Sequence, residues 1–203
     1  MTEIPTLICL VGRKGAGKDT AASVLTAQGY ANVKFAGALK DMIRALLAYQ
    51  GVDDDTIERM VEGDLKEVAT PYLAGKTPRF AMQTLGTEWG RYLIGEGLWT
   101  DAAISRSRLH AKTVITDGRF PNELEAVETE GGVNIGITAD WITPTEGEHE
   151  SERLIDDLIS SFPENHRLVN HRVKPGEDVG KVIQHFQYRF LALLHTLEKG
   201  SVH

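Results

Sequence analysis

Short apolar runs alternate along the chain with longer segments in which apolar residues recur every three or four positions. The runs are typical of buried strands, and the recurring segments are typical of helices with one apolar face. Because strands and helices alternate, the pattern predicts an α/β fold in which helices cover both faces of a parallel sheet. The strands are expected over residues 7–11, 33–35, 113–116, 133–138 and 167–170.

The predicted helices are unevenly distributed along the chain. A long helical stretch at about 51–110 lies between the second and third strands and exceeds a simple crossover. In a single domain of residues 1–203, this insertion is the natural place for a substrate-binding region. A closing amphipathic helix is expected over 178–197, with Ile183, Phe186, Phe190 and Leu194 on one face. Other helices are expected at 39–47, 53–68, 79–85, 87–94 (after a break near Gly86), 99–109, 122–130 and 151–159.

Composition restricts the class of partner. The 203 residues carry a net charge of −7, which disfavours a nucleic acid because neutralising its phosphates requires an excess of lysine and arginine. The single cysteine, Cys9, cannot form an internal disulfide, which fits a reducing compartment. No apolar run approaches the roughly 18 residues of a membrane span, and no signal peptide is visible. We therefore expect a cytoplasmic protein that binds neither nucleic acid nor a membrane.

A glycine-rich segment follows the first strand. Residues 12–20 read Gly-Arg-Lys-Gly-Ala-Gly-Lys-Asp-Thr, and a helical pattern comes directly afterwards. This context is typical of a phosphate-binding P-loop, because glycines let backbone N–H groups face phosphate oxygens and the helix N-terminus adds partial positive charge. Lys18 is expected to bridge the β- and γ-phosphates of a nucleoside triphosphate. The predicted nucleotide contacts are Gly12, Arg13, Gly15, Ala16, Gly17, Lys18, Asp19 and Thr20.

The position after Lys18 departs from the usual motif. Ser or Thr normally stands there, and its hydroxyl holds magnesium, whereas this chain has Asp19 followed by Thr20. The Asp19 carboxylate could hold the metal directly or through water, or the hydroxyl role could pass to Thr20. Both alternatives stay open on the sequence.

Two more candidates follow the strand over 113–116. Asp117 is a carboxylate at the end of an apolar strand, and beside a P-loop it is expected to reach Mg²⁺. Arg119 comes two residues later and could clamp a phosphoryl group with two hydrogen bonds. The alternative for Arg119 is a surface arginine that pairs with Glu123.

The insertion carries polar residues at helical spacing. They recur at intervals of a few residues: Arg79, Gln83, Thr87, Glu88 and Arg91. If they share a helix face, a glutamine and an arginine suit the polar edge of a base or a monophosphate, and Trp99 could stack on that base. A solvated face beside a core tryptophan explains the same spacing equally well.

Four segments resemble the bacteriophage deoxynucleoside monophosphate kinases, a branch of the P-loop kinases. They are residues 12–20, whose Gly-Lys-Asp variant phosphomevalonate kinases of the animal type share; residues 35–41; residues 79–91 with Trp99; and residues 117–123 with His-Glu-Ser-Glu at 149–152. They span most of the chain in order. The segment Met-Gln-Thr-Leu-Gly-Thr-Glu at 82–88 is the most discriminating of them.

This resemblance implies a P-loop NTPase fold with a five-stranded parallel sheet, and transfer of the ATP γ-phosphoryl group to a deoxynucleoside 5′-monophosphate with Mg²⁺. It implies catalytic roles for Lys18, Arg119 and Lys14, metal contacts from Asp19 and Asp117, and a further ATP contact from Asn170. The acceptor contacts that it implies are Lys14, Lys40, Arg79, Gln83, Thr87, Arg91, Trp99, Arg119 and Glu152.

The lid that covers the phosphates in related kinases is altered here. The resemblance places it at about 139–153, but residues 136–150 contain no arginine or lysine. Its cationic role is therefore expected from Arg153, from Arg13 and Lys14, or from another residue.

Two other functions stay open. One is a kinase of another small phosphorylated acceptor, such as phosphomevalonate or dephospho-coenzyme A, although the tryptophans and the Gln83 segment favour an acceptor with a base. The other is a nucleotide-binding module without a small acceptor, although the guanine-reading Asn-Lys-x-Asp signature is missing. The helix over 178–197 could pack in the core or on a second copy, so a homodimer is possible.

Overall fold

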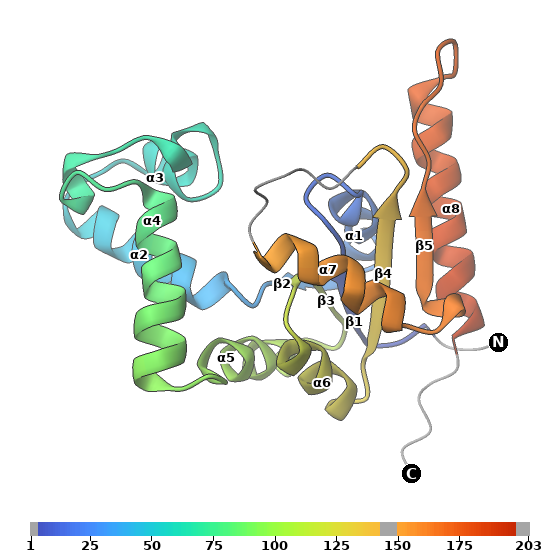
Figure 1. Ribbon diagram of the computed structural model, residues 1–203, viewed down its shortest axis with the longest axis horizontal. Coiled ribbons are helices and arrows are strands. Elements are labelled where there is room, and N and C mark those ends of the chain that lie inside the picture. The colour runs from blue at the N-terminus through green and yellow to red at the C-terminus, as the bar shows by residue number, and fades with distance from the viewer. Residues whose placement is uncertain (1–3, 143–149, 198–203) are drawn as a thin grey trace. The chain divides into compact units, whose positions relative to one another are not determined.

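A parallel sheet lies at the centre of the part of the chain that contains the glycine-rich loop (Figure 1). The computed structural model describes residues 4–142 and 150–197, and the side chains of all of these except residues 150–153. Within them, β1 (Leu7–Val11), β2 (Ala31–Val33), β3 (Thr113–Gly118), β4 (Val133–Ala139) and β5 (Arg167–Asn170) form one five-stranded sheet in the order β2-β3-β1-β4-β5. Every neighbouring pair is parallel, which confirms the predicted fold class. The second strand begins at Ala31, two residues before the predicted start.

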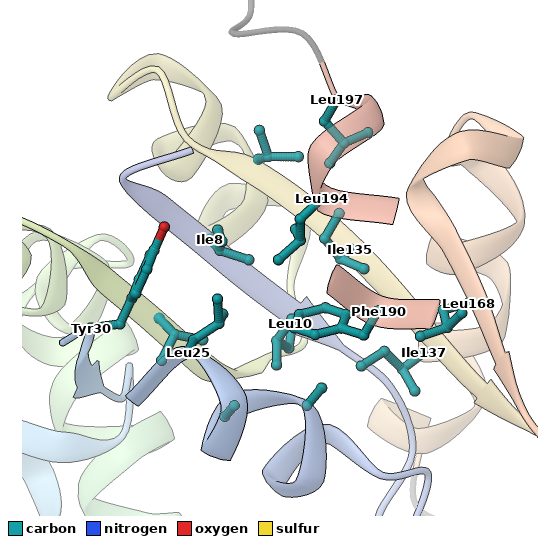
Figure 2. Close-up of a cluster of buried hydrophobic side chains, with 14 of the residues drawn as sticks. Ile8, Leu10, Leu25, Tyr30, Ile135, Ile137, Leu168, Phe190, Leu194 and Leu197 are labelled. Atoms are coloured by element: carbon teal, nitrogen blue, oxygen red, sulfur yellow. The ribbon is translucent and has the colours of Figure 1, made fainter. Parts of the chain in front are cut away.

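Side chains alternate between the two faces of the sheet. On one face, Ile8, Leu10, Ile135 and Ile137 pack against α1 (Lys18–Thr26) and α8 (Val179–Thr196), and Phe190 is fully buried among them (Figure 2). This side of the sheet is therefore closed by the first and last helices.

The opposite face packs against α6 (Pro121–Thr129) and α7 (Glu150–Ser161). Glycines allow this close approach: a Cβ atom at Gly136 would lie 2.7 Å from Ile159, and one at Gly132 would lie 2.8 Å from Val127. A short 3₁₀ helix, η4 (Glu164–His166), then leads into β5.

One residue of the predicted α8 face is placed wrongly by the pattern. Phe186, Phe190 and Leu194 are buried, but Ile183 is 42% exposed. Ile183 belongs to the N-terminal turns of α8, which carry no fully buried residue. The apolar face of the helix therefore begins one turn later than predicted.

Packing divides the chain into two compact units, one of residues 35–103 and one of the remainder. The smaller unit has its own core, which includes Leu39, Ile57, Met82 and Trp99. Because α2 (Gly37–Tyr49) belongs to this core, the unit begins at Phe35, before the expected start of the insertion at about 51. Its other elements are α3 (Asp54–Val61), the 3₁₀ helices η1 (Asp64–Glu67) and η2 (Pro71–Leu73), α4 (Pro78–Thr84), the π-helix η3 (Leu85–Ile94) and the start of α5 (Leu98–Ser107).

Two helix predictions in this unit are wrong. The helix expected over 53–68 ends at Val61, because Glu62 and Gly63 turn the chain into η1. The break expected near Gly86 does not occur, since α4 continues directly as η3. A π-helix bonds each N–H five residues back, a shift in pairing that the apolar period does not reveal.

Among the described residues, no helix is long and apolar enough to cross a bilayer.

Candidate functional site

Residues 12–17 connect β1 to α1 and have the backbone conformation that a glycine-rich loop permits. Gly15 and Gly17 have φ angles of 82° and 105°, in the left-handed region. A Cβ atom at Gly12 would lie 2.4 Å from the backbone oxygen of Ile137. The three glycines are therefore required by the turn and by its contact with β4.

The side chain of Lys18 folds back over this loop. Its Nζ atom donates hydrogen bonds to the carbonyl oxygens of Gly12 (2.6 Å) and Arg13 (3.0 Å). The ammonium group thus lies against the turn, where an anion bound by the loop would meet it.

Arg13 has its side chain held in an ion pair. Its side chain is 8% exposed, and its Nε and Nη2 atoms donate to the carboxylate of Asp156 on α7 at 3.0 and 2.8 Å. The two residues line a cavity of about 230 Å³ together with Ala16, Ile137, Thr138, Ala139 and Ile142. The Arg13 side chain therefore ties the loop to α7, and its contact with ATP stays a prediction.

Asn170, at the end of β5, braces the loop from the other direction. Its Nδ2 atom donates to the carbonyl oxygen of Ala16 at 3.1 Å, and it lies 2.5 Å from the place of a Cβ atom on Gly17. An ATP contact was predicted for Asn170, and the structure uses its amide to hold the backbone that would contact ATP.

A bulge in β3 lies next to Asp117. Cys9 of β1 is paired with Ile115, but Val11 is paired with Gly118, so β3 has one extra residue between the two pairs. Such bulges redirect side chains at the ends of strands. The sheet register therefore gives Asp117 an orientation that simple alternation does not predict.

Electrostatics indicates which groups surround Cys9. Burial raises the pKa of its thiol well above the ordinary value, and the carboxylates of Asp117 and Glu123 raise it further. Cys9 is thus a protonated core thiol, and the two carboxylates lie close to it.

Glu123 interacts with the backbone after β3. Its Oε2 atom accepts hydrogen bonds from the N–H groups of Arg119 (2.9 Å) and Phe120 (3.2 Å). Glu123 is buried, and Arg119 is half-buried. Glu123 was considered as an ion-pair partner for the Arg119 side chain, and these two hydrogen bonds fix the turn that carries Arg119.

The two predicted metal ligands come from neighbouring elements. Asp19 is exposed in the first turn of α1, Asp117 is half-buried in β3, and these elements pack together. The described residues contain no cluster of three or more His, Cys, Asp or Glu side chains that could hold a metal. A site with only one or two carboxylates is typical of Mg²⁺, because the ion keeps several waters and takes its other ligands from substrate phosphates.

Within the unit of residues 35–103, the predicted acceptor residues lie on α2, α4 and η3, apart from Trp99 on α5. Lys40 pairs with Glu62 (Nζ–Oε1 2.8 Å), and Arg79 pairs with Glu67. Further along, Gln83 is exposed, and Thr87 and Arg91 are half-buried. Since the helix changes from α to π at Leu85, an interval of three or four residues does not define one face through this segment.

Trp99 is a core residue, which corrects the prediction that it stacks on a base. It is 4% exposed, and its Nε1 atom donates to the carbonyl oxygen of Gly86 at 2.8 Å. A Cβ atom at Gly90 would lie 2.3 Å from the indole, so the helix backbone covers the ring. Trp89, whose ring centroid is 6.1 Å from that of Trp99, is 38% exposed. Of these two indoles, that of Trp89 is therefore the accessible one; Trp89 lies in the segment 79–91 that carries the resemblance, but it was not predicted as a site residue.

Comparison with known sequences decides the family. No protein-family model matches the chain. A protein of Acanthamoeba polyphaga mimivirus, named "Putative deoxynucleotide monophosphate kinase", is 35% identical over 172 residues, which cover 75% of this chain and 86% of the relative. The chain belongs to the deoxynucleotide monophosphate kinase family. An origin in a bacteriophage, a relation to phosphomevalonate kinases and a homodimer stay predictions.

One solved structure resembles this family member only weakly. TT1252 from Thermus thermophilus is 17% identical, and the alignment covers 94% of this chain and 98% of that one, with a TM-score of 0.31. A TM-score that low carries no structural conclusion, so the fold assignment rests on the strand order and pairing of this chain.

Part of the site predicted for a deoxynucleotide monophosphate kinase lies outside the described residues. The part that is not described comprises residues 143–149 of the expected lid and the side chains of Glu152 and Arg153. Asp156 was missed in the sequence, because nothing near it indicates a partner in the loop. A pocket of about 450 Å³ after β5 was missed as well, and its lining is His171, Arg172, Lys174, Glu177, Asp178, Lys181, Val182 and His185.

Proposed function

We propose that this protein transfers the γ-phosphoryl group of ATP to a deoxynucleoside 5′-monophosphate, which gives the diphosphate and ADP and supplies precursors for DNA synthesis. The observation that carries the proposal is the 35% identity to the mimivirus protein, whose name specifies a kinase of deoxynucleotide monophosphates. The glycine-rich loop with Lys18 supports it independently, because it is suited to triphosphate binding.

The donor phosphates are bound by the loop in this proposal. The N–H groups of residues 12–17 face the β- and γ-phosphates, and Lys18 exchanges its bonds to loop carbonyls for bonds to phosphate oxygens. Thr20 is close enough in sequence to contribute its hydroxyl. The base and ribose of the donor occupy the 450 Å³ pocket, which begins next to Asn170 in the chain and contains two imidazole rings.

In this proposal Asp19 and Asp117 would hold Mg²⁺, which would neutralise charge on the donor phosphates when bound. The protein residues around it orient the reactants. The bulge in β3 directs Asp117, and Glu123 fixes the turn that presents Arg119.

The acceptor attacks through a phosphate oxygen that is already anionic, so no strong general base is required. Rate enhancement comes from positioning and charge neutralisation, for which Lys14 and Arg119 are the cationic groups beside the loop. Lys40 and Arg79 bind the acceptor phosphate. Gln83, Thr87 and Arg91 contact the base, and the exposed ring of Trp89 replaces Trp99 as the stacking surface.

The proposal is tested by incubating the protein with ATP, Mg²⁺ and each natural deoxynucleoside monophosphate in turn, with chromatography of the nucleotides. We expect equimolar ADP and deoxynucleoside diphosphate with at least one acceptor. Phosphomevalonate and dephospho-coenzyme A are included as competing acceptors. Slow ATP hydrolysis that no deoxynucleotide stimulates would instead indicate a nucleotide-binding module without a small acceptor.

A further inference from the structure

Three cationic side chains come together within the unit of residues 35–103. Lys40 lies on α2, Lys66 on η1 and Arg79 on α4, and η1 packs against both α3 and α4. Glu62 pairs with Lys40, and Glu67 pairs with Arg79. Lys66 stands between these two glutamates in the chain. We call Lys40, Lys66 and Arg79 the cation cluster.

The cations of the cluster are more buried than the carboxylates that accompany them. The Lys40 side chain is 13% exposed and its partner Glu62 is 36% exposed, while Arg79 is 42% exposed and Glu67 is 63% exposed. The glutamates therefore lie nearer to water than the cations do, although Glu62 is also 3.6 Å from Nη2 of Arg44. An anion that replaced them would find the positive groups already in place.

Lys66 is the member of the cluster that the fold itself does not explain. It is half-buried, and within the described part of the chain its ammonium group has no hydrogen-bond or ion-pair partner. Burial lowers the pKa of Lys66, and the positive charge of Lys40 lowers it further. Desolvating an ammonium group without a direct partner is unfavourable, which is typical of groups that serve a ligand.

We propose that Lys66 binds the 5′-phosphate of the acceptor nucleotide, together with Lys40 and Arg79. This inference rests on the proposed function and adds to it a residue that the sequence did not indicate. A phosphate monoester offers a double negative charge and three terminal oxygens, which match two ammonium groups and one guanidinium. Together with Glu62 and Glu67, the three cations of the cluster carry a net charge of +1 in a chain whose total is −7.

The test compares Lys66→Met with a control, Lys76→Met, in steady-state kinetics. Lys76 lies in the same unit, is exposed, and is placed over the Phe80 ring at 5.4 Å instead of in the cluster. Both variants lose one positive charge. We expect Lys66→Met to raise the KM for the deoxynucleoside monophosphate about 10- to 100-fold with kcat nearly unchanged, because a hydrogen bond between charged groups is lost from bound acceptor throughout the reaction. Lys76→Met should retain the wild-type KM, and Lys66→Arg should restore most of the affinity.

Calorimetry separates a phosphate contact from a structural effect. The probes are a deoxynucleoside 5′-monophosphate and the corresponding deoxynucleoside, each titrated into the wild type and Lys66→Met. Weaker binding of the monophosphate alone supports the inference. Equal weakening of both probes overturns it, because the phosphate is then not the group that Lys66 contacts.

The kinetic outcomes also distinguish this inference from the proposed function. If the wild type phosphorylates deoxynucleotides and Lys66→Met keeps its KM within twofold, the inference is wrong and the function stands. If the wild type phosphorylates no deoxynucleotide, the proposed function fails. Calorimetry then still decides whether Lys66 binds a nucleotide phosphate.

Discussion

Replacing Asp156 by Asn tests whether α7 holds the phosphate-binding loop in place. The substitution removes the negative charge that faces the guanidinium of Arg13 and keeps the shape of the side chain. Two atoms of Arg13 donate to the carboxylate at 2.8–3.0 Å. In the variant, a buried guanidinium therefore loses the negative charge of this partner.

The magnitude follows from distance and exposure. Two unit charges 2.8 Å apart interact by about 6 kcal/mol at an effective dielectric constant of about 20. Asp156 is 46% exposed, so water screens much of this attraction, whereas Arg13 is only 8% exposed and cannot recover its hydration when the charge is lost. We expect the free energy of unfolding to fall by about 2 kcal/mol, within the range for a hydrogen bond between charged groups.

The assay is thermal and urea unfolding followed by far-UV circular dichroism. A loss of about 2 kcal/mol corresponds to a fall in Tm of about 4–8 °C for a chain of this size. Asp157→Asn is the matched control, because Asp157 is the neighbouring residue, carries the same charge and is exposed. Arg13→Met and the double variant complete a mutant cycle that isolates the coupling between the two side chains.

Activity gives a second measurement on the same variants. If the pair positions the loop, Asp156→Asn should also raise the KM for ATP, while Asp157→Asn should not. Equal stability of the two variants, within about 0.5 kcal/mol, would refute the inference that the ion pair ties the loop to α7.

Three further substitutions probe the loop and the insertion. Lys18→Met should abolish deoxynucleoside diphosphate formation while Tm stays within a few degrees, because two of the lost Nζ bonds are to carbonyls of the loop itself; ADP release and thermal unfolding measure this. Gly17→Ala should cost about 1–2 kcal/mol in urea unfolding, since φ is 105° and the new methyl meets Asn170. Trp99→Phe should cost about 1–2 kcal/mol in urea unfolding, because the half-buried Gly86 carbonyl loses its indole donor.

Each of these predictions has a control and an outcome that contradicts it. Lys34→Met removes a lysine outside the proposed site and should leave turnover unchanged; turnover in Lys18→Met would mean that the loop lysine is not catalytic. Gly29→Ala has a similar φ of 87° with no atom within 4 Å of its Cβ, so a cost equal to that of Gly17→Ala would exclude the Asn170 contact as a cause. Trp89→Phe should be milder than Trp99→Phe, and the reverse order would contradict the assignment of Trp99 to the core.

Local chemistry made the loop and the sheet predictable. An apolar run that ends at a glycine, followed by a lysine and an apolar helical period, specifies a strand, a turn and a helix in succession. Gly15 and Gly17 have the positive φ angles that such a turn needs. These features depend on residues within one short segment, which is why they can be predicted without knowledge of the rest of the chain.

Contacts between distant residues could not be predicted in the same way. Arg13 and Asp156 are 143 positions apart, and neither residue type indicates its partner. Trp99 was equally suited to a base or a core, and its burial depends on Gly90 approaching the indole. The continuation of α4 into a π-helix depends on how backbone pairing shifts, which side-chain periodicity does not record.

By itself, the sequence determined the α/β class, the five parallel strands and the position of the glycine-rich loop, because hydrophobic period and backbone freedom act locally. Tertiary structure alone decided which charges meet: Arg13 pairs with Asp156, Lys40 pairs with Glu62, and Lys66 is half-buried near Lys40 with no direct partner among the described residues. Electrostatic energy depends on distance and solvent exposure, and both are fixed only when separate elements pack together. For this reason the residue type of Lys66 gave no indication of a role, whereas its surroundings do.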